Sequence, residues 1–510
     1  MADSEPLELP LVLLSHRGPV TFDRDLSGRT VSRGSGGLVS ALSGLAEHLS
    51  DEVWVCGAAT EEDAVVAREA GGEAILVQTT PTPHVVEGEP DGPVLRVRLV
   101  ATDPRAHAAF YAMVSNPILW FVQHGLYGRA VSPVLTRADH EAFDQGYVAV
   151  NRVFADAVAD EVVARGGKAL VMLQDYHFYL VAERVRERCP DVFLSHFVHI
   201  PWPGPDDWRV LPPQWREQLL HGLLGSDVVG FHTRRYAYHF VLCAQELLGL
   251  PVDLDALTVR VGERTVAARY YPISVDPAHL DAVLATDEVT EHVRQLSEAF
   301  LDDGRRLIVR VDRTDPSKNV VRGFLAFGTL LDQHPELVGQ VSFLALLQPS
   351  RTDVSEYADY IALIGAVVAE VNAAHTKEGR QPIDLRLVED FGLAVAAYSI
   401  CDVLMVNALA DGMNLVAKEL AVVNRRDGVL ALSENAGAHE ELGQFAVTLH
   451  PFDVQQTADG LYEALTMPVE ERRRRLAAAA AQVRTHDVSR WLSEQLDDLR
   501  ALAGSAGKSR

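Results

Sequence analysis

The stretch RLIVRVDRTDPSKN, residues 306–319, decides the fold, because it joins a strand, a turn and the start of a helix. An apolar run of strand length ends at Arg313, and Pro316 stands at a position that the first turn of a helix accepts. Lys318 follows Arg313 by five positions in this turn. Two cations beside a helix N-terminus suit a leaving diphosphate, but a surface pair explains the spacing equally well.

Other apolar runs of strand length alternate with helical patterns along the whole chain. They cover residues 9–17, 52–59, 169–177, 192–202, 341–349, 401–409 and 429–435. Strands that are buried on both faces of a parallel sheet have this continuous apolar character. The alternation of such strands with helices predicts an α/β protein with mostly parallel sheets.

The alternation begins again around RYYPISVDP, residues 269–277, which predicts a domain boundary. We expect two Rossmann-like, doubly wound domains at residues 1–275 and 276–510, facing each other across a cleft. The final helix is expected to pack back on the first domain. Ligands of such sheets bind beyond the carboxyl ends of the strands. Polar residues stand at or just after the ends of the apolar runs: Arg17, Asp175, His199, Arg313, Arg351, Asp411 and Glu434.

Composition excludes some classes of partner. The net charge of -25, from 46 basic and 71 acidic residues, argues against broad binding to nucleic acid or to a membrane surface. The sequence has no run of eighteen apolar residues, and MADSEPLELP at its start lacks a basic leader, so we expect a cytoplasmic protein. The four cysteines have no metal-binding spacing. The one dense basic run, Arg472–Arg475, is expected to be a solvated helix face.

A glycine-rich stretch, GSGGLVSAL at residues 34–42, precedes a pattern of leucines at helical spacing. Glycines let the backbone approach a ligand, and the amides of a helix start attract anions. Val39 stands where a dinucleotide fingerprint needs glycine, and the chain has no P-loop. A phosphate loop and a plain tight turn both remain open at this stage.

The stretch ALADGMNLVAKEL, residues 408–420, combines two carboxylates with a helix start. Asp411 and Gly412 open a turn, and Glu419 follows about two helical turns later. The amides expected to begin the helix belong to Met413, Asn414 and Leu415. One carboxylate can accept hydrogen bonds from sugar hydroxyls, and the second can accept both hydroxyls of a ribose. The amides at the start of the helix can bind a diphosphate. By spacing alone, an aspartate cap with a solvated glutamate is the more common pattern.

Other polar and aromatic residues are ambiguous when each is taken alone. Tyr111 and Trp120 lie in YAMVSNPILW and have the character of core residues, while Asp175 and His199 end apolar runs. A histidine in such a place is more often a satisfied buried group than a catalyst. The chain contains neither G-x-S-x-G nor H-E-x-x-H, which leaves hydrolase chemistry with little support.

Taken together, these motifs resemble the trehalose-6-phosphate synthases, a retaining glycosyltransferase family with the two-domain GT-B fold. The resemblance covers roughly residues 9–500. The shared motifs are GGL, SNPILW, DYH, HIPWP, SRTDV, DGMNLVAKE and SENAGAHEEL, in the order of the family and at compatible spacings.

The resemblance implies a role for each matching residue. Gly36 and Gly37 would contact the donor diphosphate, and Arg313 and Lys318 would stabilise it as it leaves. Asp411, with the backbone of Gly412, Met413, Asn414 and Leu415, would hold the donor glucose, His199 would contact that sugar near its 6-position, and Glu419 would bind the ribose. The acceptor sugar would be bound by Asp175, and its phosphate by Arg17, Tyr111, Trp120 and Arg351.

The implied reaction transfers glucose from a nucleoside diphosphate to glucose 6-phosphate and gives α,α-trehalose 6-phosphate with retained configuration. No metal and no cofactor are expected, because arginine, lysine and helix amides can neutralise the diphosphate. The expected partners are a nucleotide sugar and a sugar phosphate, without nucleic acid or membrane, and the chain is expected to act as a monomer or a homo-oligomer.

The sequence departs from the family pattern in three places. QDYH at residues 174–177 replaces HDYH, NALADG lacks a basic residue two positions before the aspartate, and Gly57 stands where many members have tryptophan. RTDPSKN, HIPWPGPDDWRVLP and HPFD resemble related pseudoglycosyltransferases that use a GDP-cyclitol, which favours GDP-glucose over UDP-glucose as donor. Two alternatives stay open: such a cyclitol-coupling enzyme, and a catalytically silent sensor of sugar phosphates.

Overall fold

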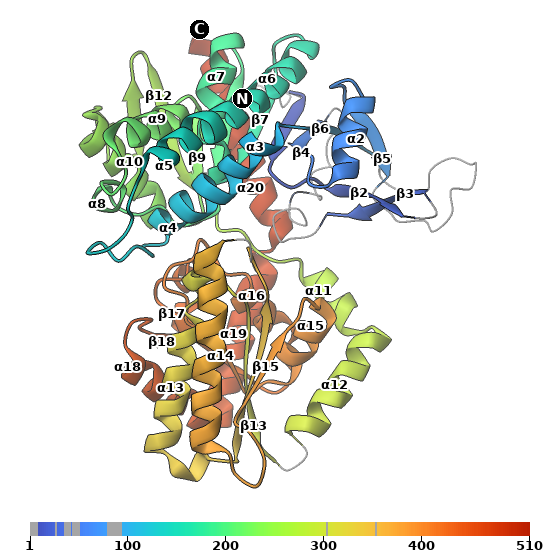
Figure 1. The fold of residues 1–510 in the computed structure, drawn as a ribbon, viewed down its shortest axis with the longest axis vertical. Coiled ribbons are helices and arrows are strands. Elements are labelled where there is room, and N and C mark those ends of the chain that lie inside the picture. The colour runs from blue at the N-terminus through green and yellow to red at the C-terminus, as the bar shows by residue number, and fades with distance from the viewer. Residues whose placement is uncertain are drawn as a thin grey trace, which may run out of the picture. The chain divides into compact units, whose positions relative to one another are not determined.

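The computed structural model describes residues 9–25, 28–34, 42, 52–78, 94–301, 304–351 and 354–509. The chain forms two compact units (Figure 1). The first comprises Met1–Tyr271 and Leu492–Arg510, and the second Pro272–Trp491. The second unit therefore begins four residues before the boundary expected at 276. The reason lies in the connecting segment, where the carbonyl oxygens of Ile273 and Val275 accept hydrogen bonds from Lys418 Nζ and Val488 N of the second unit.

The second unit contains a parallel sheet in the Rossmann order, with helices on both faces. Its strands, in sheet order, are β15 (Ile383–Leu387), β14 (Val341–Gln348), β13 (Arg306–Arg313), β16 (Val403–Val406), β17 (Val429–Ser433) and β18 (Val447–Leu449). Its helices are α11 (Pro277–Leu284), α12 (Asp287–Phe300), α13 (Val320–Gln333), α14 (Ser355–His375), α15 (Phe391–Ile400), α16 (Val416–Val423), α17 (His439–Leu442), α18 (Val454–Thr466) and α19 (Val469–Thr485). In chain order, β14 and β15 are added on one side of β13, and β16, β17 and β18 on its other side. The strand order therefore reverses between the neighbours β13 and β16.

The first unit contains a ten-stranded sheet that is parallel except at its edges. Its strands, in sheet order, are β10 (Val252–Asp253), β11 (Thr258–Val261), β12 (Arg264–Tyr270), β9 (Val228–Phe231), β8 (Phe193–Phe197), β7 (Leu170–Gln174), β1 (Leu11–Ser15), β4 (Glu52–Gly57), β6 (Val94–Val100) and β5 (Ile75–Gln78). A hairpin of β2 (Val20–Asp25) and β3 (Gly28–Arg33) stands apart from this sheet. In this sheet the strand order reverses between the neighbours β1 and β7, because β4 and β6 follow on one side of β1 and β7, β8 and β9 on the other.

The helices of the first unit connect these parallel strands. They are α2 (Glu61–Glu69), α3 (Pro104–Ala108), α4 (Trp120–Gln123), α5 (Arg137–Ala142), α6 (Ala149–Ala164), α7 (Val181–Arg188), α8 (Pro205–Trp208), α9 (Pro213–Leu224) and α10 (Arg234–Leu248), with π-helical segments at Ala109–Leu119 and Phe143–Val148. The last helix, α20 (Val488–Ser509), begins in the second unit and continues into the first. There Asp498 accepts hydrogen bonds from Arg269 and Tyr271.

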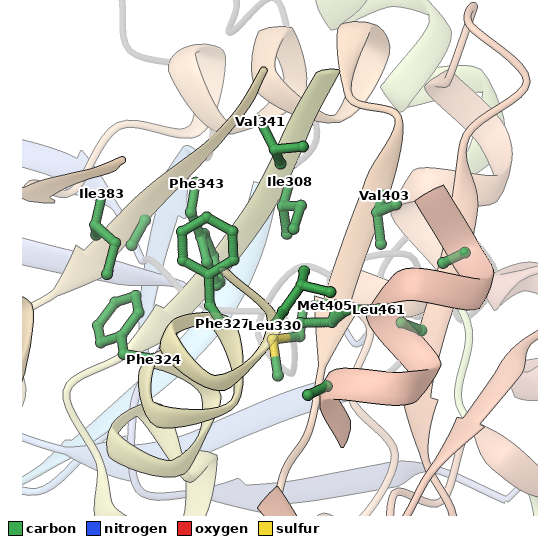
Figure 2. Close-up of a cluster of buried hydrophobic side chains, with 14 of the residues drawn as sticks. Ile308, Phe324, Phe327, Leu330, Val341, Phe343, Ile383, Val403, Met405 and Leu461 are labelled. Carbon is green, nitrogen blue, oxygen red and sulfur yellow. The ribbon is translucent and has the colours of Figure 1, made fainter. Parts of the chain in front are cut away.

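All eight apolar runs contain strands, as the sequence predicts. In the second unit, alternate residues of these strands pack against α13, α14 and α18 and form one core cluster (Figure 2). Phe343 of β14 lies at its centre, edge-on to Phe324 and Phe327 at centroid distances of 5.3 and 5.2 Å. The helix α14 has the length and hydropathy of a membrane span, but Ile364 and Val371 are buried in this core.

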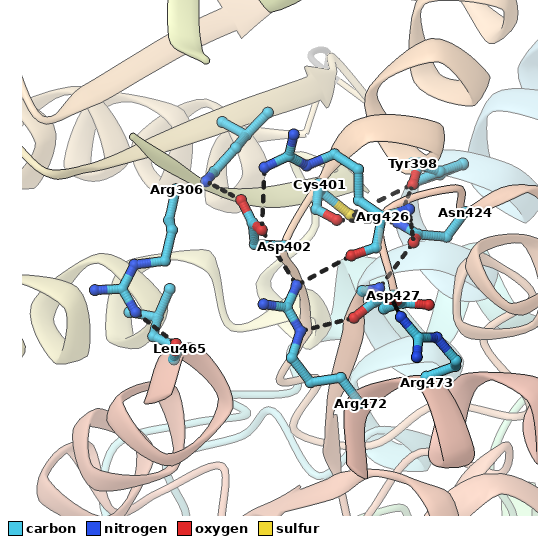
Figure 3. A network of polar contacts seen from close by, with 12 residues as sticks. Arg306, Tyr398, Cys401, Asp402, Asn424, Arg426, Asp427, Leu465, Arg472 and Arg473 are labelled. Carbon is cyan, nitrogen blue, oxygen red and sulfur yellow. Dashed lines mark hydrogen bonds and ion pairs between the residues drawn. The ribbon is translucent and has the colours of Figure 1, made fainter. Parts of the chain in front are cut away.

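The basic run Arg472–Arg475 lies on α19 and makes ion pairs and hydrogen bonds within the second unit. Arg472 bonds to the buried Asp402 at 3.2 Å and to the carbonyl oxygen of Asp427 at 2.8 Å (Figure 3). Asp402 also accepts a hydrogen bond of 2.9 Å from the amide of Leu307. Arg472 therefore links helix α19 to the residues that precede β16 and β17. All four cysteines are buried and unpaired.

We predict that Phe343→Ala lowers the free energy of unfolding of the second unit by about 3–5 kcal/mol, because it opens a cavity between two phenylalanine rings. Leu363→Ala, at a half-exposed position of α14, should change this free energy by about 0.5 kcal/mol or less. Hydrogen–deuterium exchange of the amides in β13 and β14 measures the difference. Equal protection in the two variants would contradict the assigned core.

Candidate functional site

The strongest candidate site of the second unit lies beyond the carboxyl ends of β13 and β16. These neighbouring strands mark the point where the strand order reverses, and ligands of open parallel sheets bind at such points. Several hydrogen bonds join the loops that follow the strands. The amide of Leu409 donates to Ser317 O at 2.8 Å, and Asn319 Nδ2 donates to Asn407 O at 3.0 Å. The motifs RTDPSKN and DGMNLVAKE thus meet at one place.

A lysine and an aspartate form an ion pair at this junction. Lys318 Nζ donates a hydrogen bond to Asp411 Oδ2, and Asn414 Nδ2 donates to the same oxygen at 3.1 Å. Both members of the ion pair are largely buried. An anionic ligand can therefore draw the ammonium group to itself while its hydroxyl groups replace the ammonium as donors to the carboxylate.

Two arginines share one buried carboxylate beside this pair. Asp315 is fully buried, and its Oδ2 lies 3.3 Å from Arg351 Nη1 and 3.7 Å from Arg313 Nη2. Arg351 also donates a 2.5 Å hydrogen bond to the hydroxyl of Tyr357, and its own backbone has a φ of +51°. The two guanidinium groups thus lie near one buried carboxylate, and guanidinium is the side-chain group whose geometry best suits a phosphate.

A third arginine lies beneath the two loops and was not anticipated from the sequence. Arg310 is fully buried in β13, where it pairs with Asp312 at 2.9 Å. Its Nη2 donates at 2.6 Å both to the carbonyl oxygen of Lys318 and to Asn407 Oδ1. The sequence feature that could have identified Arg310 is its charge in the middle of an apolar strand. A charged side chain is stable in such a place only if it is paired or hydrogen-bonded.

The turn before α16 is shaped by close backbone contacts. The sequence predicts that Met413, Asn414 and Leu415 begin this helix. In the structure the helix begins at Val416, and these three residues form the turn before it. Asn414 has a φ of +74°. A side chain on Gly437, in the loop after β17, would place its Cβ 1.9 Å from the carbonyl oxygen of Gly412, which explains the need for glycine there.

Glu419 stands on α16 behind this turn, and its carboxyl group is shielded from water. Burial raises the pKa of Glu419 to about 7, against the opposing effect of a hydrogen bond from the Tyr398 hydroxyl. The carboxyl group therefore changes its protonation state near neutral pH, and as a carboxylate it can accept two hydroxyl groups of a ligand.

The first unit has an equivalent point of strand reversal between β1 and β7. Just beyond these strands the ring of His16 stacks on His177, with centroids 4.6 Å apart, and on Tyr111 at 5.1 Å. His107 continues the stack at 5.7 Å from His16. Burial lowers the pKa of His16 to about 3, so this ring is uncharged at neutral pH. The stack adds His16, His107 and His177 to the expected Tyr111.

Asp175 joins the ends of β7 and β8. It has a strained φ of +70°, which its surroundings maintain. Its amide donates to Phe197 O at 2.7 Å, and its Oδ1 accepts a hydrogen bond of 3.1 Å from the amide of His199. The imidazole of His199 lies between Gln174 and His232, and burial holds the pKa of His199 well below its usual range.

The remaining predicted residues lie in different surroundings. Arg17 is exposed just after β1, whereas Trp120 is largely buried and stacks on His124 at 4.0 Å. Gly36 and Gly37, with most of the helix expected after them, fall outside the described residues. Arg351 belongs to the second unit, while the other predicted acceptor residues belong to the first.

One group of side chains in the described part of the chain has the spacing of metal ligands. It consists of Glu288, His292 and Asp390, on α12 and at the N-terminus of α15. None of these residues belongs to the loops described above, and the absence of a metal from the reaction stays a prediction.

Comparison with known proteins identifies the family. The profile of glycosyltransferase family 20 matches residues 10–501. The α,α-trehalose-phosphate synthase (UDP-forming) 1 of Aspergillus fumigatus is 32% identical, over 100% of this chain and 93% of that protein. A solved α,α-trehalose-phosphate synthase (UDP-forming) from Burkholderia xenovorans, in complex with glucose-6-phosphate, is 26% identical with a TM-score of 0.78, over 96% of this chain and 100% of that one.

A structure from E. coli, bound with UDP-2-fluoro glucose, is 25% identical with a TM-score of 0.79, over 96% of this chain and 99% of that one. The expected α/β fold of the GT-B class is thereby confirmed. The chain belongs to glycosyltransferase family 20 and is a glycosyltransferase of the trehalose-phosphate synthase class.

Proposed function

We propose that the protein transfers glucose from a nucleoside diphosphate glucose to glucose 6-phosphate and forms α,α-trehalose 6-phosphate. The observation that carries this proposal is the ion pair of Lys318 and Asp411 at the strand reversal of the second sheet, with Arg313 beside it. A cation for a diphosphate and a carboxylate for sugar hydroxyls stand there side by side. The complexes of the two solved relatives, one with glucose-6-phosphate and one with UDP-2-fluoro glucose, support the choice of substrates.

In this proposal the donor is held by the two joined loops. Arg313 and Lys318 bind the diphosphate, and Lys318 exchanges Asp411 for a phosphate oxygen. Asp411 then accepts hydrogen bonds from glucose hydroxyls, the backbone from Gly412 to Leu415 supports the sugar and its phosphate, and Glu419 accepts the ribose hydroxyls. Gly36 and Gly37 contact the diphosphate by the family resemblance.

The acceptor residues are assigned by the family resemblance. Asp175 binds the acceptor sugar, and Arg17, Tyr111, Trp120 and Arg351 bind its phosphate. The stack around His16, a ring that burial keeps uncharged, gives the sugar a flat surface. His199 contacts the donor sugar through the part of its ring that Gln174 and His232 leave accessible.

The transfer proceeds on one face of the donor sugar. The bond between the anomeric carbon and the diphosphate oxygen breaks, the anomeric hydroxyl of the acceptor forms the new bond to that carbon, and its proton passes to the departing phosphate oxygen. Retaining hydrolases place two carboxylates across the scissile bond, whereas this reaction needs only positioning and charge stabilisation. Arg313 and Lys318 supply that stabilisation where negative charge develops.

The donor nucleotide carries either guanine or uracil, and an activity assay with both donors distinguishes them. The motifs shared with GDP-cyclitol enzymes favour GDP-glucose, whereas the Aspergillus fumigatus and Burkholderia xenovorans relatives are named UDP-forming. We predict that purified protein with glucose 6-phosphate releases nucleoside diphosphate from at least one of these donors. Trehalose 6-phosphate should be the sugar product by mass spectrometry and NMR, and the faster donor identifies the base. If neither donor reacts, the cyclitol-coupling enzyme or the silent sensor replaces this proposal.

We predict that Lys318→Ala lowers kcat by about 10²–10³-fold, the usual cost of removing one donor to a developing negative charge. The KM for glucose 6-phosphate should change much less, because Lys318 binds the donor. Lys377→Ala, at an exposed position after α14, is the matched control and should keep the activity of the unchanged protein. A kcat for Lys318→Ala equal to that of this control would remove the lysine from the leaving-group role.

The raised pKa of Glu419 predicts a pH dependence of donor binding. Below pH 7 the carboxyl group is protonated and loses acceptor capacity, so donor affinity should fall as the pH decreases from about 8 to about 6. Calorimetric titration with the nucleotide sugar alone avoids the titration of the acceptor phosphate. Glu419→Gln should bind the donor more weakly and without this dependence, whereas Glu463→Gln, exposed on α18, should keep it. The same pH dependence in Glu419→Gln would refute the assignment.

A further inference from the structure

Three side chains form a row across neighbouring strand ends of the first unit. Gln174 ends β7, His199 follows β8, and His232 follows β9. The Nε2 atom of His199 lies 2.8 Å from Gln174 Oε1, and its Nδ1 lies 3.2 Å from His232 Nε2. His232 Nδ1 lies 3.4 Å from the carbonyl oxygen of Tyr271, after β12. The row thus ends at a backbone group that can only accept a hydrogen bond.

The carbonyl end of the row determines where the ring protons lie. Because Tyr271 O only accepts, the Nδ1 atom of His232 carries the hydrogen, and in the form with a single ring hydrogen its Nε2 atom is an acceptor. The Nδ1 atom of His199 must then donate to it. Since burial also keeps His199 uncharged, its Nε2 atom has no hydrogen and needs a donor.

Gln174 can supply that donor. Its side chain is buried, and its amide nitrogen has no hydrogen-bond partner among the described residues, while its oxygen faces the acceptor Nε2 of His199. A half turn about the last side-chain bond exchanges the two amide atoms, so that the amide nitrogen donates to His199 Nε2 and the amide oxygen takes the position without a partner. Buried oxygens that lack a partner are more common in proteins than buried N–H groups that lack one. The reverse direction of the row would leave the Gln174 nitrogen without a partner and point a lone pair of His232 at the carbonyl oxygen of Tyr271.

We propose that Gln174 is a positioning residue that donates to His199 Nε2 and, with His232, fixes His199 as the uncharged Nδ1–H tautomer. The role of His199 beside the donor sugar rests on the proposed function, but the tautomer does not. In this state His199 neither gives nor takes a proton and acts by its position alone. Gln174 is also the residue at which QDYH departs from the family pattern, so the departure replaces a titratable ring by a neutral donor.

The surroundings of His199 make the orientation of its ring matter. The Phe197 ring packs against His199 and His232, with centroids at 4.5 and 4.9 Å. Two further titratable groups face the row: Asp175, whose Oδ1 accepts from the His199 amide, and His196, whose Nε2 donates to Asp175 O. Both contacts fix backbone groups at the ends of β7 and β8, next to which Gln174 and His199 stand.

Nitrogen-15 NMR of the histidine rings in the full-length protein tests the tautomer without any activity. The signals of His199 are assigned by their loss in His199→Asn. We expect a protonated Nδ1 and an unprotonated Nε2 that stay unchanged between about pH 6 and pH 8. A hydrogen on Nε2, or an imidazolium in this range, would overturn the inference.

Variants of Gln174 give a second, independent readout. Gln174→Glu presents a carboxylate that draws a hydrogen to His199 Nε2, so His199 should become an imidazolium with both nitrogens protonated. Gln174→Leu should lower kcat by about tenfold, the factor expected for one hydrogen bond, and Gln174→His, whose ring can donate, should restore most of it. Equal kcat values for the leucine and histidine variants would contradict a donor role at this position. A protein with the expected tautomer but no synthase activity would refute the proposed function alone.

Discussion

The buried guanidinium group of Arg310 is the contact on which the site of the second unit depends. It lies in the strand β13 and donates to a carbonyl oxygen of one loop and to a side chain of the other, so the two loops at the strand reversal keep one spacing. A buried charge costs several kcal/mol unless it is paired and hydrogen-bonded. Here Asp312 pairs with the Nε atom and the two loops accept from Nη2, while Nη1 has no hydrogen-bond partner among the described residues. The position of Lys318 relative to Asp411 follows from this arrangement.

The charges above Arg310 are arranged for a ligand that is itself charged. Asp315, fully buried, holds Arg313 and Arg351 near each other, and Lys318 is paired with Asp411. A diphosphate that enters such a place meets cations already oriented by the protein, so little reorganisation is needed as negative charge grows on its oxygens. The helix α16 adds backbone amides at its start, where anions are also favoured.

Much of this arrangement was predictable, because strands buried on both faces leave continuous apolar runs and their ends bring polar residues together. Arg313, Asp411, Asp175 and His199 were found in this way. The short strand β9 and the alternating strand β6 (VLRVRLV) leave weaker signals and were missed. Contacts between residues far apart in the chain were also missed: Arg310 bonds to Asn407, and His199 to His232, across distances that no local pattern encodes.

The two strand reversals differ in charge in a way that matches the two halves of the proposed reaction. Around β1 and β7 the rings of His16 and His199 are kept uncharged by burial, so the groups that the proposed function assigns to a sugar there offer hydrogen bonds and flat surfaces. Around β13 and β16 the arginines and the lysine stay charged because carboxylates lie beside them. Histidines that could gain a proton near neutral pH would compete for the proton that passes from acceptor to phosphate. In the proposed reaction the proton therefore passes between the substrates themselves, because the neutral rings of His16 and His199 do not take it up.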